Sequence, residues 1–254
     1  MNALQQLREA LLPAPCAVCG AEESGPLRLC APCVERMQVL SPACPLCGSA
    51  QSAAANAIAV ADKVLLGGAA APCLACVAKP PKIRRRAIWR YDEAGAALMR
   101  LFKRRGGYAL AGPISNAAWR AGVRSDPALP DWLAGVELVC AIPSHPLRRL
   151  SRGYNPAGLL AAELAKAAQL SAPVALLRKR RPGGQTGRSG AKRRKIGRAF
   201  AAGWRWKLAR DKRILLIDDV ETTGATLRSA ALELLRLGAK EVRALTIFRV
   251  TDER

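Results

Sequence analysis

Eight of the nine cysteines in this chain of 254 residues stand in four Cys-x-x-Cys pairs, all within its first third. The pairs are Cys16/Cys19, Cys30/Cys33, Cys44/Cys47 and Cys73/Cys76. Two thiolates three positions apart can hold one metal ion on a tight turn, and two such turns complete a tetrahedral set of four sulfur ligands. The spacing therefore predicts two structural zinc ions, with no ligand position left open for a reacting water.

A disulfide framework is the alternative interpretation of these cysteines. The N-terminal residues do not have the basic-then-apolar order of a secretory signal, because polar residues are interspersed with Leu4, Leu7, Leu11 and Leu12. We therefore expect a cytoplasmic protein with reduced thiols, which favours zinc. Sequential pairing, with Cys16 to Cys33 around one ion and Cys44 to Cys76 around the other, is preferred to a crossed arrangement, which the spacing leaves open.

The chain is long enough for one sizeable domain and a smaller module. The cysteine pairs place the module at residues 1–82 and leave residues 83–254 for the larger domain. Half of the residues are apolar, which is ample for a core, yet no run approaches the roughly 18 apolar residues of a membrane span. The sequence thus predicts two unequal parts and no membrane span.

The charge is strongly positive, with 41 Lys and Arg against 19 Asp and Glu and a formal net charge of +22. Basic residues without any acidic one fill two blocks, residues 79–90 and residues 178–198. Blocks of this kind are typical of solvated surface and often contact phosphates, which suggests polyanionic partners. A general compositional bias toward arginine and alanine is the alternative.

The C-terminal region reads as a strand, a polar turn, a helix and a second strand. Residues 214–217 form a continuous apolar run, as in a strand buried on both faces of a parallel sheet. Apolar residues then recur at helical spacing from Leu227 to Leu237, Gly238 ends the helix, and residues 242–250 form the next strand. This order predicts an α/β fold with a central, mostly parallel sheet, in which ligands bind where strands end and turns begin.

The turn itself carries hydroxyl groups, closely spaced backbone amides and carboxylates. Asp218 and Asp219 stand at the strand end, suited to accept hydrogen bonds from the hydroxyl groups of a ribose. A helix N-terminus favours a phosphate through its free N–H groups and partial positive charge. The residues that would form this phosphate site are Thr222, Thr223, Gly224, Ala225 and Thr226. The alternative is an ordinary turn with a threonine as helix N-cap.

The string ILLIDDVETTGAT in this turn resembles the signature of type I phosphoribosyltransferases, and nearly the full chain resembles the ComF family of competence-associated proteins. The motifs that carry the second resemblance are the four cysteine pairs, Tyr91-Asp92, Lys103-Arg104-Arg105-Gly106, Ile142-Pro143, Arg152-Gly153-Tyr154-Asn155, Gln185 and the phosphate turn. The resemblance implies a type I phosphoribosyltransferase-like fold behind a zinc-binding module. It also implies binding of 5-phosphoribosyl-1-pyrophosphate (PRPP) together with Mg²⁺.

The same resemblance implies roles for individual residues. Asp218 and Asp219 would hold the ribose, residues 222–226 would cradle the 5-phosphate, and Arg152 would contact anionic substrate. Pro143 and Ser144 stand where related enzymes contact pyrophosphate, and Lys103 is a further candidate phosphate contact. Gln185 lies in a glycine- and arginine-rich segment, residues 178–200, that resembles the mobile hood of these enzymes.

Two functions follow from the family resemblance. One is a phosphoribosyltransferase-like protein that binds PRPP with Mg²⁺ and acts in DNA uptake and natural transformation, with an unidentified acceptor. The other is a non-enzymatic protein that binds single-stranded DNA during DNA uptake and natural transformation, with competence-machinery proteins as partners and a regulatory or vestigial phosphate site. The tryptophans among the basic residues, Trp204 included, could stack on bases, although core or edge-strand positions are the preferred interpretation.

Two single residues have alternative interpretations. His145, the single histidine, could act as an acid or base, but a hydrogen-bonding role in a loop fits its two flanking prolines equally well. Cys140 lies in an apolar run outside the pairs and is expected to be an inert core thiol.

Overall fold

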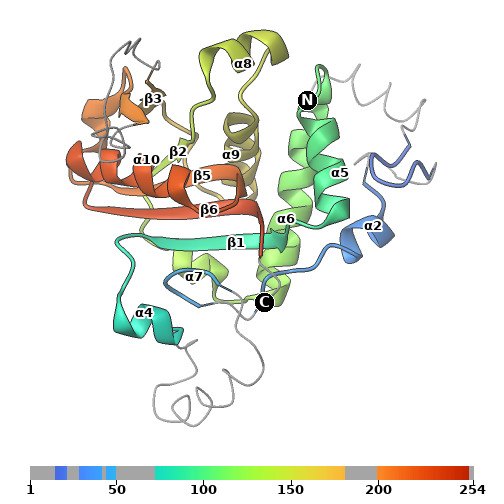
Figure 1. Cartoon of the computed structure of the whole chain (residues 1–254), viewed down its shortest axis with the longest axis horizontal. Helices are drawn as coiled ribbons and strands as arrows, with labels where there is room; N and C mark the ends of the chain where they lie inside the picture. The colour runs from blue at the N-terminus through green and yellow to red at the C-terminus, as the bar shows by residue number, and fades with distance from the viewer. Residues whose placement is uncertain (1–14, 22–28, 42–43, 50–71, 181–198, 252–254) are drawn as a thin grey trace, which may run out of the picture.

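The structure is a computed structural model that describes residues 15–21, 29–41, 44–49, 72–180 and 199–251 (Figure 1). Its centre is a four-stranded sheet with the order β1-β6-β5-β2, and all three pairings in it are parallel. The strands are β1 (Arg84–Arg90), β2 (Leu138–Ala141), β5 (Arg213–Glu221) and β6 (Glu241–Arg249). The predicted α/β fold with a parallel central sheet is confirmed.

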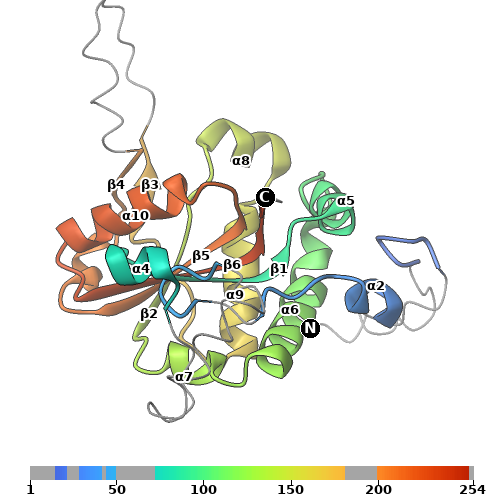
Figure 2. The same cartoon turned by 60° about the horizontal axis from the view of Figure 1, so that its bottom comes forward.

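Helices surround this sheet on both faces (Figures 1 and 2). The longer ones are α5 (Glu93–Phe102), α6 (Ala111–Ser125), α9 (Pro156–Ala167) and α10 (Ala225–Arg236). The shorter ones are α2 (Ala31–Glu35), α4 (Leu74–Ala78), α7 (Leu129–Leu133), α8 (Pro146–Arg152) and the 3-10 turns η2 (Gly107–Leu110) and η4 (Trp206–Ala209). No helix in the described ranges is both long enough and apolar enough to cross a membrane.

The two faces of the sheet bury alternate residues of the central strands. Leu215 and Ile217 of β5 point into one apolar cluster, which α5, α6 and α9 complete. Ile214 and Leu216 point into the opposite cluster, which contains the apolar face of α10. Successive side chains of a strand point to opposite faces, so a strand covered on both sides has a continuous apolar run. This is why residues 214–217 show no alternation of apolar and polar residues.

The observed elements extend beyond the predicted ones at one important place. β5 continues through Asp218 to Glu221, because β6 remains paired with it up to the partners Glu221 and Arg249. β2 is shorter, and its last residue Ala141 pairs with Ile217. Beyond that point β5 has a neighbouring strand on one side only, which leaves space beside Asp218 and Asp219.

The two basic blocks do not both lie on solvated surface, which corrects the interpretation of the first one. Residues 84–90 form β1, an edge strand of the central sheet, and Arg86 is buried with an ion pair to Asp126. The ends of the second block pair as a small antiparallel sheet of β3 (Leu177–Lys179) and β4 (Phe200–Ala202). The intervening residues 181–198, which include Gln185, lie outside the described residues.

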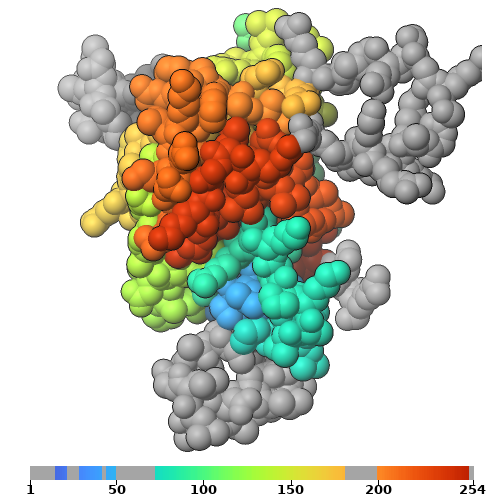
Figure 3. Space-filling view, turned by 90° about the vertical axis from the view of Figure 1, so that its left-hand side faces the viewer, coloured from blue at the N-terminus to red at the C-terminus, as the bar shows by residue number. Residues whose placement is uncertain are grey.

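The N-terminal residues pack along β1. The backbone N–H groups of Leu40 and Arg90 donate to the carbonyl groups of Ile88 and Gln38, and that of Arg85 donates to Leu46 over 2.9 Å. Figure 3 shows the surface of residues 44–49 in blue, set against the blue-green surface of residues 72–90. The cysteine-rich segments therefore cover an edge of the sheet that would otherwise expose unpaired backbone groups.

Candidate functional site

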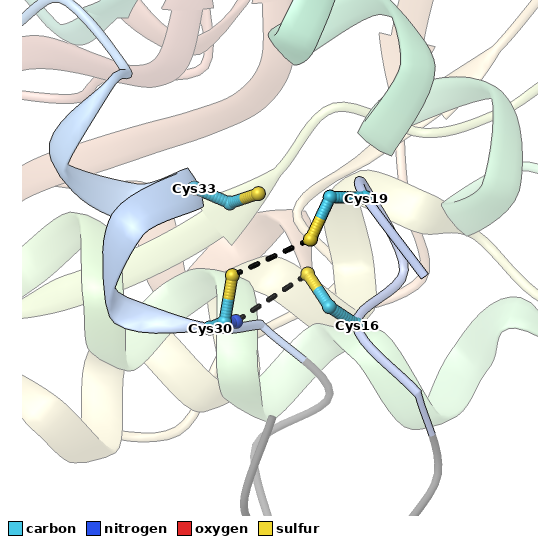
Figure 4. A group of neighbouring side chains, drawn as sticks. All are labelled: Cys16, Cys19, Cys30 and Cys33. Carbon is cyan, nitrogen blue, oxygen red and sulfur yellow. Dashed lines mark hydrogen bonds between the residues drawn. The ribbon is translucent and has the colours of Figure 1, made fainter. Parts of the chain in front are cut away.

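The eight paired cysteines form two separate clusters. Cys16, Cys19, Cys30 and Cys33 form the first cluster, and Cys44, Cys47, Cys73 and Cys76 form the second. The sulfur atoms of Figure 4 point toward one another, and in each cluster all four lie within 4.8 Å of one another. The sequential pairing is confirmed, and the cluster of four thiols from two short turns matches the ligand set of a structural zinc ion.

The sulfur separations also fit the size of the ion. The sulfur atoms of Cys19 and Cys30 are 3.6 Å apart, and those of Cys47 and Cys73 are 3.7 Å apart. A tetrahedron with zinc–sulfur bonds of about 2.3 Å requires about 3.8 Å between sulfur atoms. Burial opposes ionisation of Cys16, but hydrogen bonds from the backbone amides of Cys30, Cys19 and Val18 lower its pKa to about 6. The thiolate form that binds a metal is thus favoured there.

Cys140 takes no part in either cluster. It is buried in β2 with 1% of its surface exposed, and burial raises the pKa of its thiol to about 12. A neutral, buried thiol is a poor nucleophile and a poor metal ligand. The interpretation of Cys140 as an inert core residue is confirmed.

A cavity of about 500 Å³, called the main cavity below, lies beside Asp218 and Asp219 where β2 has ended. The predicted site residues that line it are Lys103, Pro143, Ser144, Arg152, Asp218, Asp219 and Thr226. His145, Arg148, Asn155 and Lys179 are among the other residues that line it. The fold therefore brings together, in one concave site, candidate residues that are separated by more than 100 positions in the sequence.

Asp218 and Asp219 have different surroundings within this cavity. The amine of Lys103 lies 2.7 Å from a carboxylate oxygen of Asp219. Asp218 keeps part of its surface exposed to the cavity, yet burial of its carboxyl group, and next the negative charge of Asp219, raise its pKa well above the usual range. A carboxyl group whose pKa is raised by burial and by a second carboxylate beside it is typical of a functional site.

The segment Arg152 to Asn155 holds two neighbouring loops in place. The Tyr154 hydroxyl donates to the carbonyl groups of Phe102 and Arg104, on either side of Lys103. The Asn155 side chain donates to the Ile142 carbonyl over 2.9 Å and accepts from the Ser144 hydroxyl over 2.5 Å. Sequence reasoning named Tyr154 and Asn155 within a motif but missed this role, which depends on contacts with residues 11 to 52 positions away.

The turn 222–226 faces two cavities. Thr226 lines the main cavity, whereas Thr222 and Thr223 line a cavity of about 340 Å³, called the turn cavity, together with Cys47, Arg85 and Arg249. Gly224 has a left-handed φ of +69° and is the N-cap of α10, so a side chain there would be strained. Within the described residues the backbone amides of Gly224 and Thr226 donate no hydrogen bond, as expected in the first turn of a helix.

His145 is the N-cap of α8, and its Nδ1 atom accepts from the backbone amide of Leu147 over 3.3 Å. This agrees with the interpretation of a hydrogen-bonding loop residue. Among the tryptophans, Trp89 is fully buried, as preferred, but Trp204 is 78% exposed, which contradicts a core position. Trp204 follows Gly203, where the chain leaves β4, and within the described residues the guanidinium of Arg205 lies over its ring.

Comparisons with known proteins agree with the two-part architecture. Residues 150–254 match the phosphoribosyl transferase domain, and residues 7–77 match the double zinc ribbon domain. A solved structure of the allosteric regulatory enzyme of purine biosynthesis is 20% identical over 55% of this chain and 26% of that enzyme, with a TM-score of 0.36. The chain thus spans about a quarter of that enzyme's length. No curated protein matches the chain.

The protein thus combines a phosphoribosyltransferase-type domain with an N-terminal double zinc ribbon. The domain match begins at residue 150, after β1 and β2, yet both strands belong to the same sheet as β5 and β6. Lys103, Pro143 and Ser144 line the main cavity from this unmatched part of the chain.

Proposed function

We propose that the protein binds PRPP with Mg²⁺ in the main cavity and transfers its phosphoribosyl group to an acceptor. The observation that carries this proposal is the meeting of Asp218, Asp219 and the N-terminus of α10 in one cavity lined by basic side chains from other loops. PRPP has the complementary parts, namely two ribose hydroxyl groups, a 5-phosphate and a pyrophosphate. We also propose residues 1–82 and 83–254 as the two domains.

Each part of the ligand has a suitable partner. The carboxylates of Asp218 and Asp219 accept hydrogen bonds from the ribose hydroxyl groups, and the free amides of Gly224 and Thr226 bind the 5-phosphate. The cationic residues that line the cavity bind the pyrophosphate. They are Lys103, Arg148, Arg152 and Lys179. Ser144 lines the cavity beside them, and its hydroxyl group donates to Asn155. Gln185 remains a proposed hood residue outside the described structure.

The cavity chemistry also fits Mg²⁺, which prefers oxygen ligands and is usually held by one or two carboxylates plus substrate phosphates. Bound with PRPP, the ion would offset the charge of the pyrophosphate leaving group. In the transfer step the bond from C1 to the pyrophosphate oxygen breaks, and its electron pair leaves with pyrophosphate. The acceptor donates the pair that forms the new bond to C1 and loses its proton to the departing pyrophosphate or to water. Arg152 and Lys103 stabilise the negative charge that develops on the leaving group.

Titration calorimetry with PRPP and Mg²⁺ tests this function. The hydroxyl groups of the ribose stabilise the ionised form of Asp218, so its raised pKa should fall on binding and a proton should be released. Affinity should therefore increase as the pH rises above the ordinary aspartate pKa of about 3.9. Titrations in buffers of different ionisation enthalpy measure the released proton, with free PRPP and Mg²⁺ as the blank. No saturable binding at any pH would contradict the proposal.

The acceptor is identified by a separate assay. Purified protein is mixed with PRPP, Mg²⁺ and a panel of nucleobases, amines and oligonucleotides, and the release of pyrophosphate is scored. The acceptor that raises this rate above the rate in water identifies the substrate class. Binding without release for every acceptor would favour a regulatory phosphate site.

A second candidate function, binding of single-stranded DNA during natural transformation, is supported by the surroundings of Trp204. A cavity of about 810 Å³, called the Trp204 groove, adjoins the main cavity at Pro143, Ser144 and Lys179. Its cationic lining residues are Arg149, Arg178, Lys179 and Arg180. The guanidinium of Arg205 lies 4.7 Å from the centre of the Trp204 ring, so an exposed aromatic face stands among positive charges. For this function we propose competence-machinery proteins in the cytoplasm as partners.

Replacing Trp204 with alanine should weaken binding of a single-stranded oligonucleotide by about 5- to 100-fold, because one stacked base contributes about 1–3 kcal/mol. Trp206→Ala is the matched control, because Trp206 does not line the groove. Fluorescence anisotropy measures both affinities. Arg178→Ala should also reduce the slope of log affinity against log salt by about 0.7, the value for one phosphate contact on a single strand. Equal effects of the two tryptophan variants would contradict a role for the groove.

A further inference from the structure

A chain of buried polar contacts connects the turn 222–226 to the second cysteine cluster. Glu221, directly before the turn, has only 2% of its side chain exposed and accepts hydrogen bonds from Arg85 and Arg249. The Nε and Nη2 atoms of Arg249 lie 2.9 Å and 2.6 Å from one carboxylate oxygen. The remaining Nη1 atom donates to the carbonyl group of Gly48, which directly follows the ligand Cys47.

The turn that holds Cys44 and Cys47 also lies in close contact with β1 at Gly48. Gly48 has a φ of +65°, and a Cβ atom there would lie 3.0 Å from the Cα atom of Arg86 and 3.1 Å from Nη1 of Arg249. It would also overlap the carbonyl oxygen of Arg85. Figure 3 shows this close packing, with the blue surface of residues 44–49 enclosed by neighbouring segments. A shift of this cysteine turn must therefore move Arg249 or β1.

The other end of the contact chain lies against the phosphate turn. A Cβ atom on Gly224 would overlap the guanidinium of Arg85 and would lie 2.6 Å from a carboxylate oxygen of Glu221. The carbonyl of Glu221 accepts from the backbone amide of Val250 over 2.9 Å. The positions of Glu221 and Arg85 therefore limit the conformations that the turn can adopt, because buried charges must remain paired.

The first cluster has no such connection. Within the described residues, no hydrogen bond or ion pair joins Cys16, Cys19, Cys30 or Cys33 to residues 218–226. Gly20 follows Cys19 as Gly48 follows Cys47 and has a similar φ of +76°, but among the described residues, apart from its chain neighbours, no heavy atom lies within 4 Å of the position of its Cβ. The chain thus contains two similar cysteine turns, of which one contacts the site, whereas the other has no contact with residues 218–226 in the described part of the chain.

We propose that metal binding at the second cluster, and not at the first, sets the conformation of the turn 222–226 through Gly48, Arg249 and Glu221. Glu221 and Arg249 are then positioning residues for the phosphate site. The expected change in PRPP affinity rests on the proposed function. The expected change in the conformation of the turn does not depend on it. Loss of the metal would release the Gly48 carbonyl, leave Arg249 without one acceptor and loosen its pairing with Glu221.

The variants Gly48→Ala and Gly20→Ala test this inference, because both keep all eight cysteines and both place alanine at a positive φ. Gly48→Ala should increase hydrogen exchange in the peptide 218–228 and weaken binding of PRPP with Mg²⁺ by about tenfold or more, the loss expected for one hydrogen bond to a charged group. Gly20→Ala should change neither by more than about twofold, since among the described residues its added Cβ atom meets no residue other than its chain neighbours. Exchange in β2, on the opposite edge of the sheet, reports any global unfolding.

A further pair of variants and one single variant separate the possible outcomes. Cys47→Ser and Cys19→Ser should each remove one zinc ion, and only Cys47→Ser should loosen the turn. Glu221→Gln should keep both zinc ions and still increase exchange in the turn, which tests the contact chain even if Gly48→Ala unfolds. Unchanged exchange in Cys47→Ser and Glu221→Gln would overturn the inference. If these variants increase hydrogen exchange in the turn but the wild-type protein does not bind PRPP, the inference is supported and the proposed function is contradicted.

Discussion

Replacing Asp218 and Asp219 together with asparagine should weaken binding of PRPP with Mg²⁺ by about 100-fold or more. Each carboxylate is proposed to accept a hydrogen bond from the ribose, and a hydrogen bond to a charged group contributes about 1.5–3 kcal/mol. Asparagine keeps the size of the side chain, so the loss reports the charge. Titration calorimetry of the variant and of the wild-type protein measures this loss of affinity.

Asp211→Asn is the matched control for this variant. Asp211 is an exposed carboxylate with a left-handed φ of +61°, a conformation that asparagine tolerates as well as aspartate does. It does not line the main cavity, so the control should bind PRPP as the wild-type protein does. Equal binding by the double variant and the wild type would exclude the carboxylate pair as the ribose site.

The single change Asp218→Asn should also raise the stability of the free protein. The folded-state pKa of Asp218 is raised, so its contribution to stability is present below the unfolded pKa of about 3.9 and is lost as the pH rises through the folded pKa. At neutral pH an uncharged asparagine avoids this cost, and each kcal/mol recovered should raise Tm by about 2–4 °C. The variant should therefore be more stable than the wild-type protein but should bind PRPP less well. This combination is typical of a charged group that is kept for ligand binding at a cost in stability.

Removing zinc from the protein should unfold its cysteine-rich segments. Zinc in sites of this type contributes on the order of 10 kcal/mol to folding at neutral pH. The segments that hold the clusters have few large apolar residues, and each cluster packs mainly its own cysteines with a single neighbouring valine or leucine. Without metal they lack a core that could replace this energy. Circular dichroism and proteolysis after chelation measure the loss, and atomic emission should give two zinc ions per chain.

Cys140→Ser is the control for the zinc count. It removes the ninth thiol, which lies in β2 outside both clusters, so the count should remain two. Cys33→Ser, in contrast, should lower the count to one. A wild-type protein that holds fewer than two ions in the reduced state would contradict the two sites.

The local structure around the proposed phosphate site could be predicted from the sequence to a large extent. The run 214–217, the helix that ends before Gly238 and the following strand all form as expected, because their apolar residues recur with the period of each element. The two cysteine clusters were predictable for a similar reason. Ligand atoms held by one short turn are brought together by local geometry, without information about the remaining fold.

Other features required the tertiary structure. The basic run 84–90 resembles solvated surface in sequence, but pairing with β6 and ion pairs with Glu221 and Asp126 bury part of it. The extension of β5 to Glu221 depends on the length of its partner β6. Neither fact is a property of the segment itself, since both depend on the residues that lie next to it in space.

The amino-acid sequence alone determined the eight zinc ligands, the parallel α/β architecture and the chemical character of the turn 218–226, because these follow from spacing and periodicity within short segments, whereas the tertiary structure decided which cysteine pairs share an ion. The tertiary structure alone decided that Lys103, Ser144 and Arg152 join the carboxylates in one cavity. It also decided that Arg249 connects Glu221 to the second cysteine cluster but not to the first. Contacts between residues up to 201 positions apart depend on how strands and helices pack, which no local pattern encodes.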